Sequence, residues 1–527
     1  MKRLLALILA LVMVVSLTAC GSKPQQAAAN PEEESGLKDT IIFAPNTDVD
    51  TLDPHTQNDS TSEQVVKVLY NTLLKFGPDG EIVGDLAESW EVSEDKKTWT
   101  FKLKEGVKFH NGTEMTAESV KGTYERAMDP ANGLVVNEII KMFEKVEVID
   151  KYEVSITTNE PYGAMMALLC NASLAIMDPE YIKKHGNDLG RTPESVNGTG
   201  SYKLASWARD DEMVLERFDD YFGEKALTQK IVYRPIPEAA ARVIALETGE
   251  VDVIQGVPAD EIERLEKTDG ISIHKAKSVG QRQFRFGCND PIIGKTKVRQ
   301  ALIYAIDRQA IIDSLFSGLS CPSTAPLAPV TWGYANLGEI KQDKEKAKQL
   351  LAEAGYPDGF KTKIVTTERY AKGVELAEII ASQLKEVGVV AEIQVMEWSA
   401  FLQTIDGITP QEFDEPIFIM GAGPSMMDAD GGLRGLYTTT LTGKNDRNYG
   451  FYSNKEVDGL IDAAMKETDV EKRKELYKRA QEILYLEDPA AMWLFDQLTN
   501  IAASNKVKNV TISPISTVTF EKATIEK

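Results

Sequence analysis

The chain has 527 residues and a formal net charge of −22 at pH 7, with 81 acidic against 59 basic side chains. Apolar residues make up 43% of the chain and charged residues 27%, a balance typical of folded proteins that predicts two or three domains at this length. The acidity argues against a nucleic-acid binder, because phosphate contacts need clustered lysine and arginine. Four cysteines and four histidines argue against a disulfide scaffold or a Cys/His zinc site.

The N-terminus has the layout of a signal peptide. Lys2 and Arg3 precede an apolar run from Leu4 to Leu17. That run is too short to cross about 30 Å of hydrocarbon as a helix. We therefore interpret residues 1–19 as a signal peptide that directs the chain out of the cytoplasm. No later stretch is long and apolar enough to predict a transmembrane helix.

Small residues surround the first cysteine, in the order Leu17-Thr18-Ala19-Cys20-Gly21. This segment resembles the lipobox of bacterial lipoproteins, which implies that Cys20 is diacylated and becomes the first mature residue. Two acyl chains are enough for stable membrane anchoring. The alternative is an ordinary secretory signal with an incidental cysteine. Residues 20–38 contain almost nothing to bury and predict a flexible linker behind the anchor.

The body that follows begins with alternating strands and helices. Thr40–Ala44 reads as a strand, and the apolar spacing from Ser60 to Leu74 predicts a helix. Trp99–Leu103 alternates as a half-buried strand, and residues 116–128 predict a helix. Val146–Thr157 alternates again and predicts a strand.

The same alternation continues to the C-terminal region. A predicted helix at 239–248 ends at Gly249 and precedes a strand at 251–254. Further helical periodicities occur in residues 298–316, 344–354, 374–387, 455–466 and 471–486, with strands at 364–365 and 391–395 between them. Helices interleaved with strands throughout the chain predict an α/β fold with several domains.

Enzyme motifs are incomplete wherever they begin. Gly294-Lys295-Thr296 would end a phosphate-binding loop, but Asn289 stands where that loop requires glycine. Gly421-Ala422-Gly423-Pro424-Ser425 has the wrong spacing for a nucleophile elbow. The acidic run from Asp428 to Gly431 lacks the remaining ligands of a calcium loop. The four histidines are scattered singly, so we predict no catalytic residue, no metal site and no cofactor, and hence no enzyme.

Several segments of the sequence match, in residue type and in order, segments found in one protein family. They are Thr51-Leu52-Asp53-Pro54-His55, Leu86-Ala87-Glu88-Ser89-Trp90, residues 99–113 (WTFKLKEGVKFHNGT), Gly198-Thr199-Gly200-Ser201-Tyr202, residues 298–308 (VRQALIYAIDR), residues 347–356 (AKQLLAEAGY) and residues 451–464 (FYSNKEVDGLIDAA). Together they resemble the peptide/nickel class of substrate-binding lipoproteins that feed ABC importers, solute-binding protein family 5. Within this class the chain is most similar to glutathione- and dipeptide-binding members.

The resemblance implies a type II periplasmic-binding-protein fold, with two α/β lobes joined by a hinge and an extra domain on the first lobe. Mapped onto this chain, lobe I comprises residues 39–75, 199–275 and 493–527. The extra domain comprises 76–198, and lobe II comprises 276–492. Ligand would sit between the lobes and stabilise the closed form by contacting both faces.

The resemblance also suggests where a ligand amine would bind. In peptide-binding relatives an aspartate after a second-lobe strand pairs with the ligand's ammonium group, and Ser425 stands at that position here. A hydroxyl cannot replace the carboxylate in a desolvated charge pair. Asp428 therefore takes over this role, with Asp430 beside it, or the ligand lacks a conventional amine there. Both aspartates also read as loop residues that cap the next helix.

Five further residues are candidates for the ligand site. Arg369 loosely matches the arginine that holds a peptide carboxylate in dipeptide binders, and a surface arginine is the alternative reading. Arg282, Asp48 and Val49 lie in segments expected to face the ligand. Trp398 would form part of the pocket wall, although an aromatic at such a position is more often a core residue.

These expectations combine into one functional hypothesis. The chain is a lipid-anchored extracytoplasmic receptor and a monomer, which captures a small peptide-like ligand and delivers it to the permease of an ABC importer. One alternative is a receptor for a nickel chelate or another non-peptide solute. A secreted hydrolase on the same anchor is a second alternative, although it requires a nucleophile–base pair that the motifs do not provide.

Overall fold

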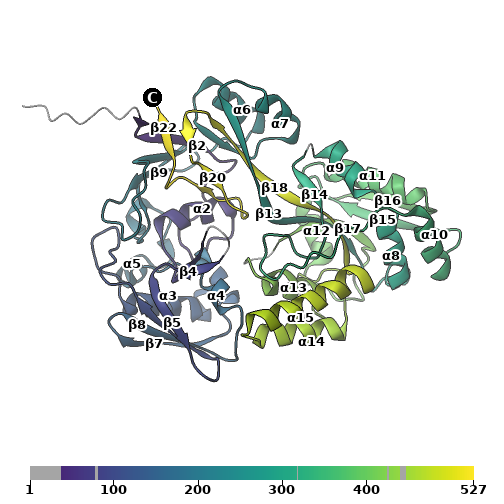
Figure 1. Ribbon diagram of the computed structural model, residues 1–527, viewed down its shortest axis with the longest axis horizontal. Helices are drawn as coiled ribbons and strands as arrows, with labels where there is room; N and C mark the ends of the chain where they lie inside the picture. The colour runs from purple at the N-terminus through teal and green to yellow at the C-terminus, as the bar shows by residue number, and fades with distance from the viewer. Residues whose placement is uncertain (1–36, 78–80, 317, 424–426, 440–446) are drawn as a thin grey trace, which may run out of the picture.

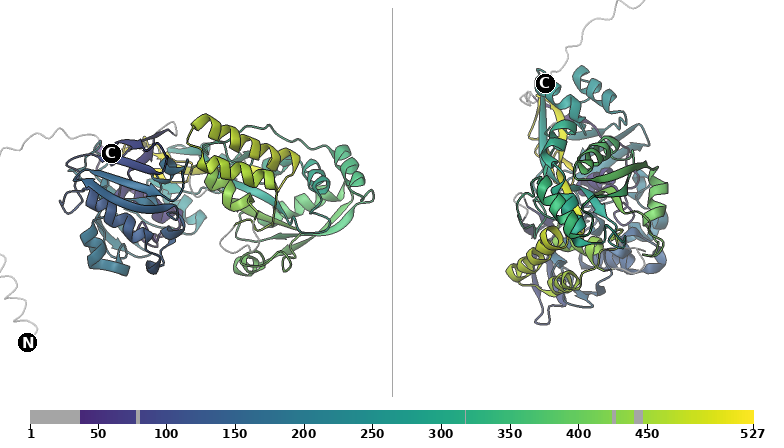
Figure 2. Two further views of the ribbon diagram at one scale, coloured as in Figure 1. Left: turned by 90° about the horizontal axis from the view of Figure 1, so that it is seen from below. Right: turned by 90° about the vertical axis from the view of Figure 1, so that its right-hand side faces the viewer.

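The computed structural model describes residues 37–77, 81–316, 318–423, 427–439 and 447–527. The predicted signal peptide, with Cys20, and Ser425 lie outside these residues. The described chain forms two α/β bodies side by side (Figure 1), and the molecule is elongated along the line that joins them (Figure 2). The N-terminal and C-terminal segments share one body, and the middle of the chain forms the other. This arrangement confirms the predicted α/β fold with two lobes.

One sheet runs through both bodies, in the strand order β16-β15-β17-β13-β18-β12-β2-β11-β10-β9. Its two central members are long: β13 spans Ile271–Phe286 and β18 spans Ala491–Ser504. Residues 271–277 of β13 pair with the end of β18 in lobe I, whereas residues 281–286 pair with β17 (Ile417–Ala422) in lobe II. The register shifts between these two halves. The strands β13 and β18 therefore connect the lobes and lie where a hinge is expected.

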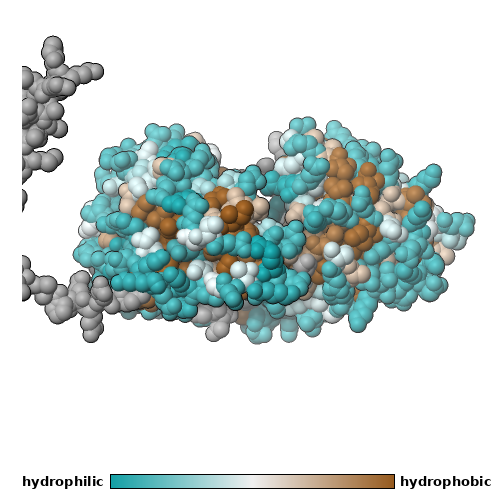
Figure 3. All heavy atoms as spheres, turned by 90° about the horizontal axis from the view of Figure 1, so that it is seen from above, coloured by the Kyte–Doolittle hydropathy of each residue, from teal (hydrophilic) through white to brown (hydrophobic). Residues whose placement is uncertain are grey.

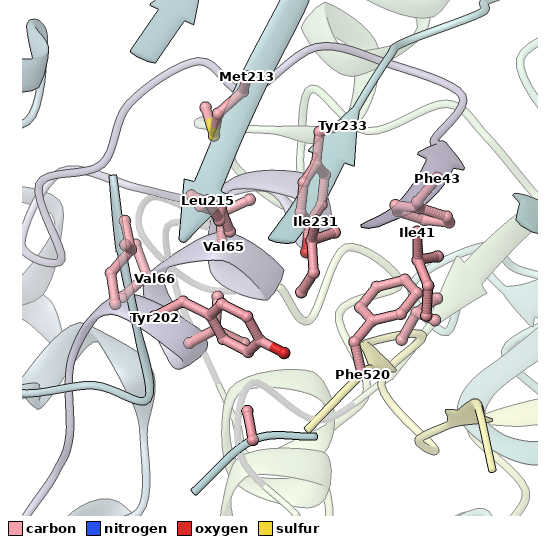
Figure 4. Close-up of a cluster of buried hydrophobic side chains, with 14 of the residues drawn as sticks. Ile41, Phe43, Val65, Val66, Tyr202, Met213, Leu215, Ile231, Tyr233 and Phe520 are labelled. Atoms are coloured by element: carbon pink, nitrogen blue, oxygen red, sulfur yellow. The ribbon is translucent and has the colours of Figure 1, made fainter. Parts of the chain in front are cut away.

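Lobe I gathers the N-terminal strand, a middle segment and the C-terminus. Phe43 packs edge-on against Tyr233 and at a tilt against Phe520, with ring centroids 5.2 and 5.3 Å apart (Figure 4). These contacts explain why no single segment of this lobe could bury its own apolar face. The elements of the lobe are β2 (Thr40–Ala44), α2 (Ser60–Leu69), β9 (Tyr202–Ala208), β10 (Glu212–Arg217), β11 (Lys230–Tyr233), α6 (Ala239–Thr248), β12 (Val253–Gln255), α7 (Ala259–Glu266), β20 (Thr511–Ile512), β21 (Val518–Thr519) and an edge sheet of β1 (Leu37–Lys38), β22 (Thr524–Glu526) and β19 (Val507–Lys508).

The extra domain has a sheet and a core of its own. Its sheet has the strand order β5-β6-β8-β7. Phe101, Tyr124 and Ile156 are among the fully buried side chains of its apolar core. Its elements are β3 (Leu74–Phe76), which crosses the predicted boundary after residue 75 and packs with this core, β4 (Ile82–Gly84), β5 (Ala87–Val92), β6 (Thr98–Leu103), α3 (Ala117–Met128), β7 (Phe143–Asp150), β8 (Glu153–Thr158), α4 (Met165–Leu168) and α5 (Pro179–His185).

Lobe II places helices on both sides of its part of the sheet. The α14–α15 pair faces the extra domain in Figure 1, and α10 and α11 lie at the far end. The elements are α8 (Thr296–Tyr304), α9 (Arg308–Leu315), β14 (Ser320–Pro322), α10 (Lys344–Glu353), β15 (Phe360–Thr366), α11 (Gly373–Lys385), β16 (Val389–Val395), α12 (Trp398–Ile405), β17, α13 (Ala429–Tyr437), α14 (Lys455–Lys466) and α15 (Val470–Glu482). The residue boundaries of the three domains stay predictions. No helix within the described ranges is long and apolar enough to cross a membrane.

Candidate functional site

A cleft of about 1110 Å³ lies between the two bodies. Seen from the top of Figure 1, the molecule shows two rounded masses with a notch between them (Figure 3). Lobe I, the extra domain and lobe II all contribute to its walls. Residues that line it include Lys67, Tyr70 and 511–519 from lobe I, Lys75, Asp85, Lys104 and Cys170 from the extra domain, and 329–332 with Met427 from lobe II.

A carboxylate is built into the extra-domain wall of this cleft. Asp85 is only 3% exposed, and its Oδ2 accepts a hydrogen bond of 2.9 Å from Asn71 Nδ2. Lys75 Nζ lies 3.1 Å from the other carboxylate oxygen. Burial lowers the pKa of nearby Lys104, and the charge of Asp85 opposes that shift. The sequence reasoning did not select Asp85, although it stands directly before the family segment that begins at Leu86.

Burial also suppresses ionisation of the neutral groups in the cleft wall. It raises the pKa of the Cys170 thiol to about 12, and the neighbouring Asp85 charge adds to the shift. It raises the pKa of the Tyr221 phenol to about 12 for the same two reasons. A thiol with so high a pKa is a poor nucleophile at neutral pH, since the thiolate is the reactive form.

Three of the predicted site residues meet on lobe II. Arg282 on β13 stacks over the Tyr370 ring, with its guanidinium carbon 3.9 Å from the ring centroid. Tyr370 meets the Trp398 ring edge-on at 5.8 Å, and Arg369 stacks over Trp398 at 4.7 Å. Tyr370 was not predicted, because nothing in the sequence shows that the loop after β15 approaches β13. We call Arg282, Arg369, Tyr370 and Trp398 the arginine–aromatic wall.

Within this wall, Arg282 is the buried arginine. The residue is 6% exposed, and its Nη1 is buried without a hydrogen-bond acceptor among the described residues. Burial lowers the pKa of the guanidinium to about 10. Gly421, its partner on β17, leaves room for it: a Cβ there would lie 3.3 Å from Arg282 Nη1. A buried cation without an acceptor is costly, and an anionic group would relieve that cost.

None of the four residues of this wall is among those that line the cleft, but Arg282 lies close to the cleft's hinge end. Val279, three residues earlier on β13, donates a backbone hydrogen bond of 3.0 Å to the carbonyl of Pro514. Pro514 is one of the cleft-lining residues of lobe I. The arginine–aromatic wall is thus placed beside the point where the two lobes are joined.

Asp428 and Asp430 have other partners. Asp428 is 2% exposed, and Arg473 holds its carboxylate in a bidentate pair with N–O distances of 2.6 and 2.7 Å. Its side chain also accepts from Asp430 N as the N-cap of α13. Asp430 accepts from Tyr477 and Arg434. Asp428 therefore caps the helix as the alternative reading expected, whereas Asp430 lies within the first turn of α13 and pairs with side chains instead. Ligand binding by either aspartate stays a prediction.

The predicted pair in the first loop belongs to lobe I. The Asp48 carboxylate accepts hydrogen bonds from Val49 N and from Asp210 N at the β9–β10 turn. Val49 is 3% exposed within the lobe I core. Neither residue is among those that line the cleft. Their predicted role in ligand binding is therefore left to experiment.

The described part of the chain brings together no group of three or more His, Cys, Asp or Glu side chains that could hold a metal ion.

Comparison with known proteins gives the chain its family. The model for bacterial extracellular solute-binding proteins, family 5 (middle region) matches residues 81–444. The chain belongs to this family. The glutathione-binding protein GsiB of Escherichia coli K12 is 31% identical to this family 5 protein over 488 residues, which cover 92% of this chain and 94% of GsiB.

Solved structures of relatives show the same architecture. HbpA2 from Haemophilus parasuis aligns with this family 5 protein at a TM-score of 0.83 and 25% identity, over 93% of this chain and all of HbpA2. The binding protein DppA from Helicobacter pylori, solved with the peptide STSA, aligns at 0.76 and 28% identity, over 93% of this chain and 98% of DppA. GsiB and DppA are binding proteins, DppA is associated with an ABC transporter, and the family consists of extracellular proteins.

Proposed function

We propose that this chain is an extracytoplasmic receptor that binds a small peptide-like ligand between its lobes and delivers it to the permease of an ABC importer. The ligand is a dipeptide, an oligopeptide or a glutathione-like compound. The chain acts as a monomer held to the membrane by a lipidated Cys20. Its task is capture and release, without a chemical step.

The observation that carries this proposal is the buried guanidinium of Arg282, whose Nη1 has no hydrogen-bond acceptor among the described residues. A carboxylate suits it, because a planar guanidinium can donate two parallel hydrogen bonds to the two oxygens. Tyr370 fixes the guanidinium plane from one side. The position at the hinge end lets a ligand carboxylate dock deep in the cleft, so that the rest of the ligand extends between the lobes. GsiB is a glutathione-binding protein and DppA was solved with a peptide, which supports a ligand of this class.

A thermal-shift screen tests the ligand class. The panel contains glutathione, di- and tripeptides, and nickel chelates. A ligand at one hundred times its Kd should raise the free energy of unfolding by about 2.7 kcal/mol. Flat responses to every peptide would contradict the proposal, and a response to a chelate alone would favour the non-peptide receptor.

Calorimetry with a matched pair of ligands tests the carboxylate site. A peptide from the screen and its C-terminal amide are titrated into the wild type and into Arg282→Gln. We expect amidation to weaken binding to the wild type by about tenfold or more, as loss of a charged hydrogen bond does. The variant should bind acid and amide alike. Arg369→Gln tests the competing candidate on the same wall: this exposed position should keep the preference, and a preference lost there instead would assign the carboxylate to Arg369. An Arg282→Gln protein that still prefers the acid would remove Arg282 from the site.

A further inference from the structure

The extra domain and lobe II touch each other on the side of the cleft away from the hinge. In Figure 1, α4 and the α14–α15 pair face each other below the strands β13 and β18. Gly163, just before α4, donates a backbone hydrogen bond of 2.7 Å to the carbonyl of Met465. Met465 also packs against the apolar core of the extra domain. This contact joins two bodies that the hinge strands connect only at the other end.

The local structure explains why this carbonyl is available. Met465 lies in the last turn of α14, where the final four carbonyls of a helix have no partner within the helix. A donor from another domain can therefore satisfy it without breaking a helical bond. Gly163 provides that donor from a loop in front of a short helix.

Two ion pairs flank the hydrogen bond. Lys466 Nζ lies 2.6 Å from Glu160 Oε2, and Lys96 Nζ lies 3.6 Å from Glu467 Oε1. In each pair one residue comes from the extra domain and the other from the end of α14. Charge complementarity over this stretch favours the contact, although each exposed pair is weak by itself.

The absence of a side chain at residue 163 is what allows this approach. A Cβ on Gly163 would lie 2.1 Å from the carbonyl oxygen of Glu467 and about 3 Å from the Arg473 side chain. All of these atoms belong to lobe II. Nothing within the extra domain itself obstructs a side chain there at such a distance.

We propose that Gly163, with Glu160 and Lys96, forms a latch that closes on residues 465–467 and stabilises the closed form of the cleft. Rotation of the lobes about β13 and β18 must break the Gly163–Met465 hydrogen bond. The latch thus sets how far the closed form is populated before ligand binds, and how fast the cleft reopens to release it. This role rests on the proposed receptor function, but its test needs no ligand.

The test compares two glycine-to-alanine substitutions in the ligand-free full chain. Gly163→Ala should open the cleft, whereas Gly459→Ala, on the same helix α14, meets nothing within 4 Å and is the control. Small-angle scattering should show a larger radius of gyration for Gly163→Ala. Hydrogen exchange should show faster exchange in residues 160–165, with a shift of about tenfold or more from the steric conflict.

A charge exchange tests the same contact without steric change. Glu160→Lys should shift the closed form towards the open one by up to about fivefold, and Glu160→Lys with Lys466→Glu should restore it. These two charge variants still test the latch if Gly163→Ala does not fold. A folded Gly163→Ala protein with wild-type scattering and exchange would overturn the latch. Failure of the peptide screen would instead concern the proposed function alone.

Discussion

At the scale of single residues, Asp428 shows how a carboxylate that resembles a ligand contact can belong to the scaffold. Its partner Arg473 lies 45 residues later in the chain and is also buried. We expect Asp428→Ala to lower the free energy of unfolding by about 3–5 kcal/mol, because it leaves a buried guanidinium without its anion. Urea denaturation of the ligand-free protein measures this loss.

Another aspartate in the same lobe supplies the control for that prediction. Asp462 pairs with Arg434 but is 63% exposed, so Asp462→Ala should change the free energy of unfolding by less than about 1 kcal/mol. If Asp428→Ala were equally mild and abolished ligand binding, the aspartate would have the ligand role predicted from the sequence.

The buried His55 leads to a prediction of how the free energy of unfolding depends on pH. Burial, helped by the Arg126 charge, holds the pKa of this imidazole well below its ordinary value. The unfolded chain therefore gains a proton near pH 6.5 that the folded protein does not. The free energy of unfolding should fall as the pH drops below about 6.5, by up to about 1.4 kcal/mol per pH unit from this group. Denaturation between pH 7 and 5 should give a steeper slope for the wild type than for His55→Gln, and equal slopes would contradict the assignment.

At the scale of elements, the predicted helix over 298–316 is two helices, α8 and α9. Asp307 separates them: its backbone is extended, and its side chain accepts from Ala310 N as the N-cap of α9. Asp307→Ala should cost about 1 kcal/mol of stability, measured by thermal or urea unfolding. Asp313→Ala, on the exposed side of the same helix, should stay within about 0.5 kcal/mol. A larger loss for Asp313→Ala than for Asp307→Ala would be inconsistent with capping.

Local sequence patterns predicted some elements at their observed positions and merged others. Elements with a strong local pattern, such as β2 and β6, fall where alternation predicts them. The predicted strand over 146–157 is instead a hairpin of β7 and β8, because residues 151–152 form its turn. A turn or a helix cap involves only a few residues, which is too short a stretch to interrupt a hydrophobic periodicity. The periodicity alone therefore does not show where one element ends and the next begins.

The site depends on contacts that local pattern cannot report. Arg282 meets Tyr370 only because β13 and β15 both lie beside β17 in one sheet. The family resemblance therefore predicted the lobes and the ligand class, and it selected Arg282, Arg369 and Trp398. It did not show that Arg282 is the buried arginine of that group, with an Nη1 that no described residue satisfies.

At the scale of the whole molecule, the polypeptide chain connects the lobes at one end of the cleft, and a non-covalent contact connects them at the other end. The long strands β13 and β18 hold the lobes together, whereas residues 160–163 and 465–467 meet through one hydrogen bond, exposed charges and the packing of Met465 on the extra domain. A receptor needs this asymmetry, because the cleft must open widely enough to admit a solute and close without unfolding either lobe.

The net charge of −22 sets how an ionic ligand approaches this cleft. The acidic surface repels an anionic peptide at long range, whereas in the proposed site the buried Arg282 attracts the peptide carboxylate only after entry. Added salt screens exposed charges more than buried ones.

Raising the salt from about 0.05 to 0.5 M should therefore speed the association of an acidic peptide by about twofold or more and slow that of a basic one, with little change in either dissociation rate. Stopped-flow fluorescence with an acidic, a neutral and a basic peptide from the screen measures these rates, the neutral peptide being the control. Slower association of the acidic peptide at high salt would mean that lysines 67, 75 and 104 in the cleft wall outweigh the charge of the whole molecule.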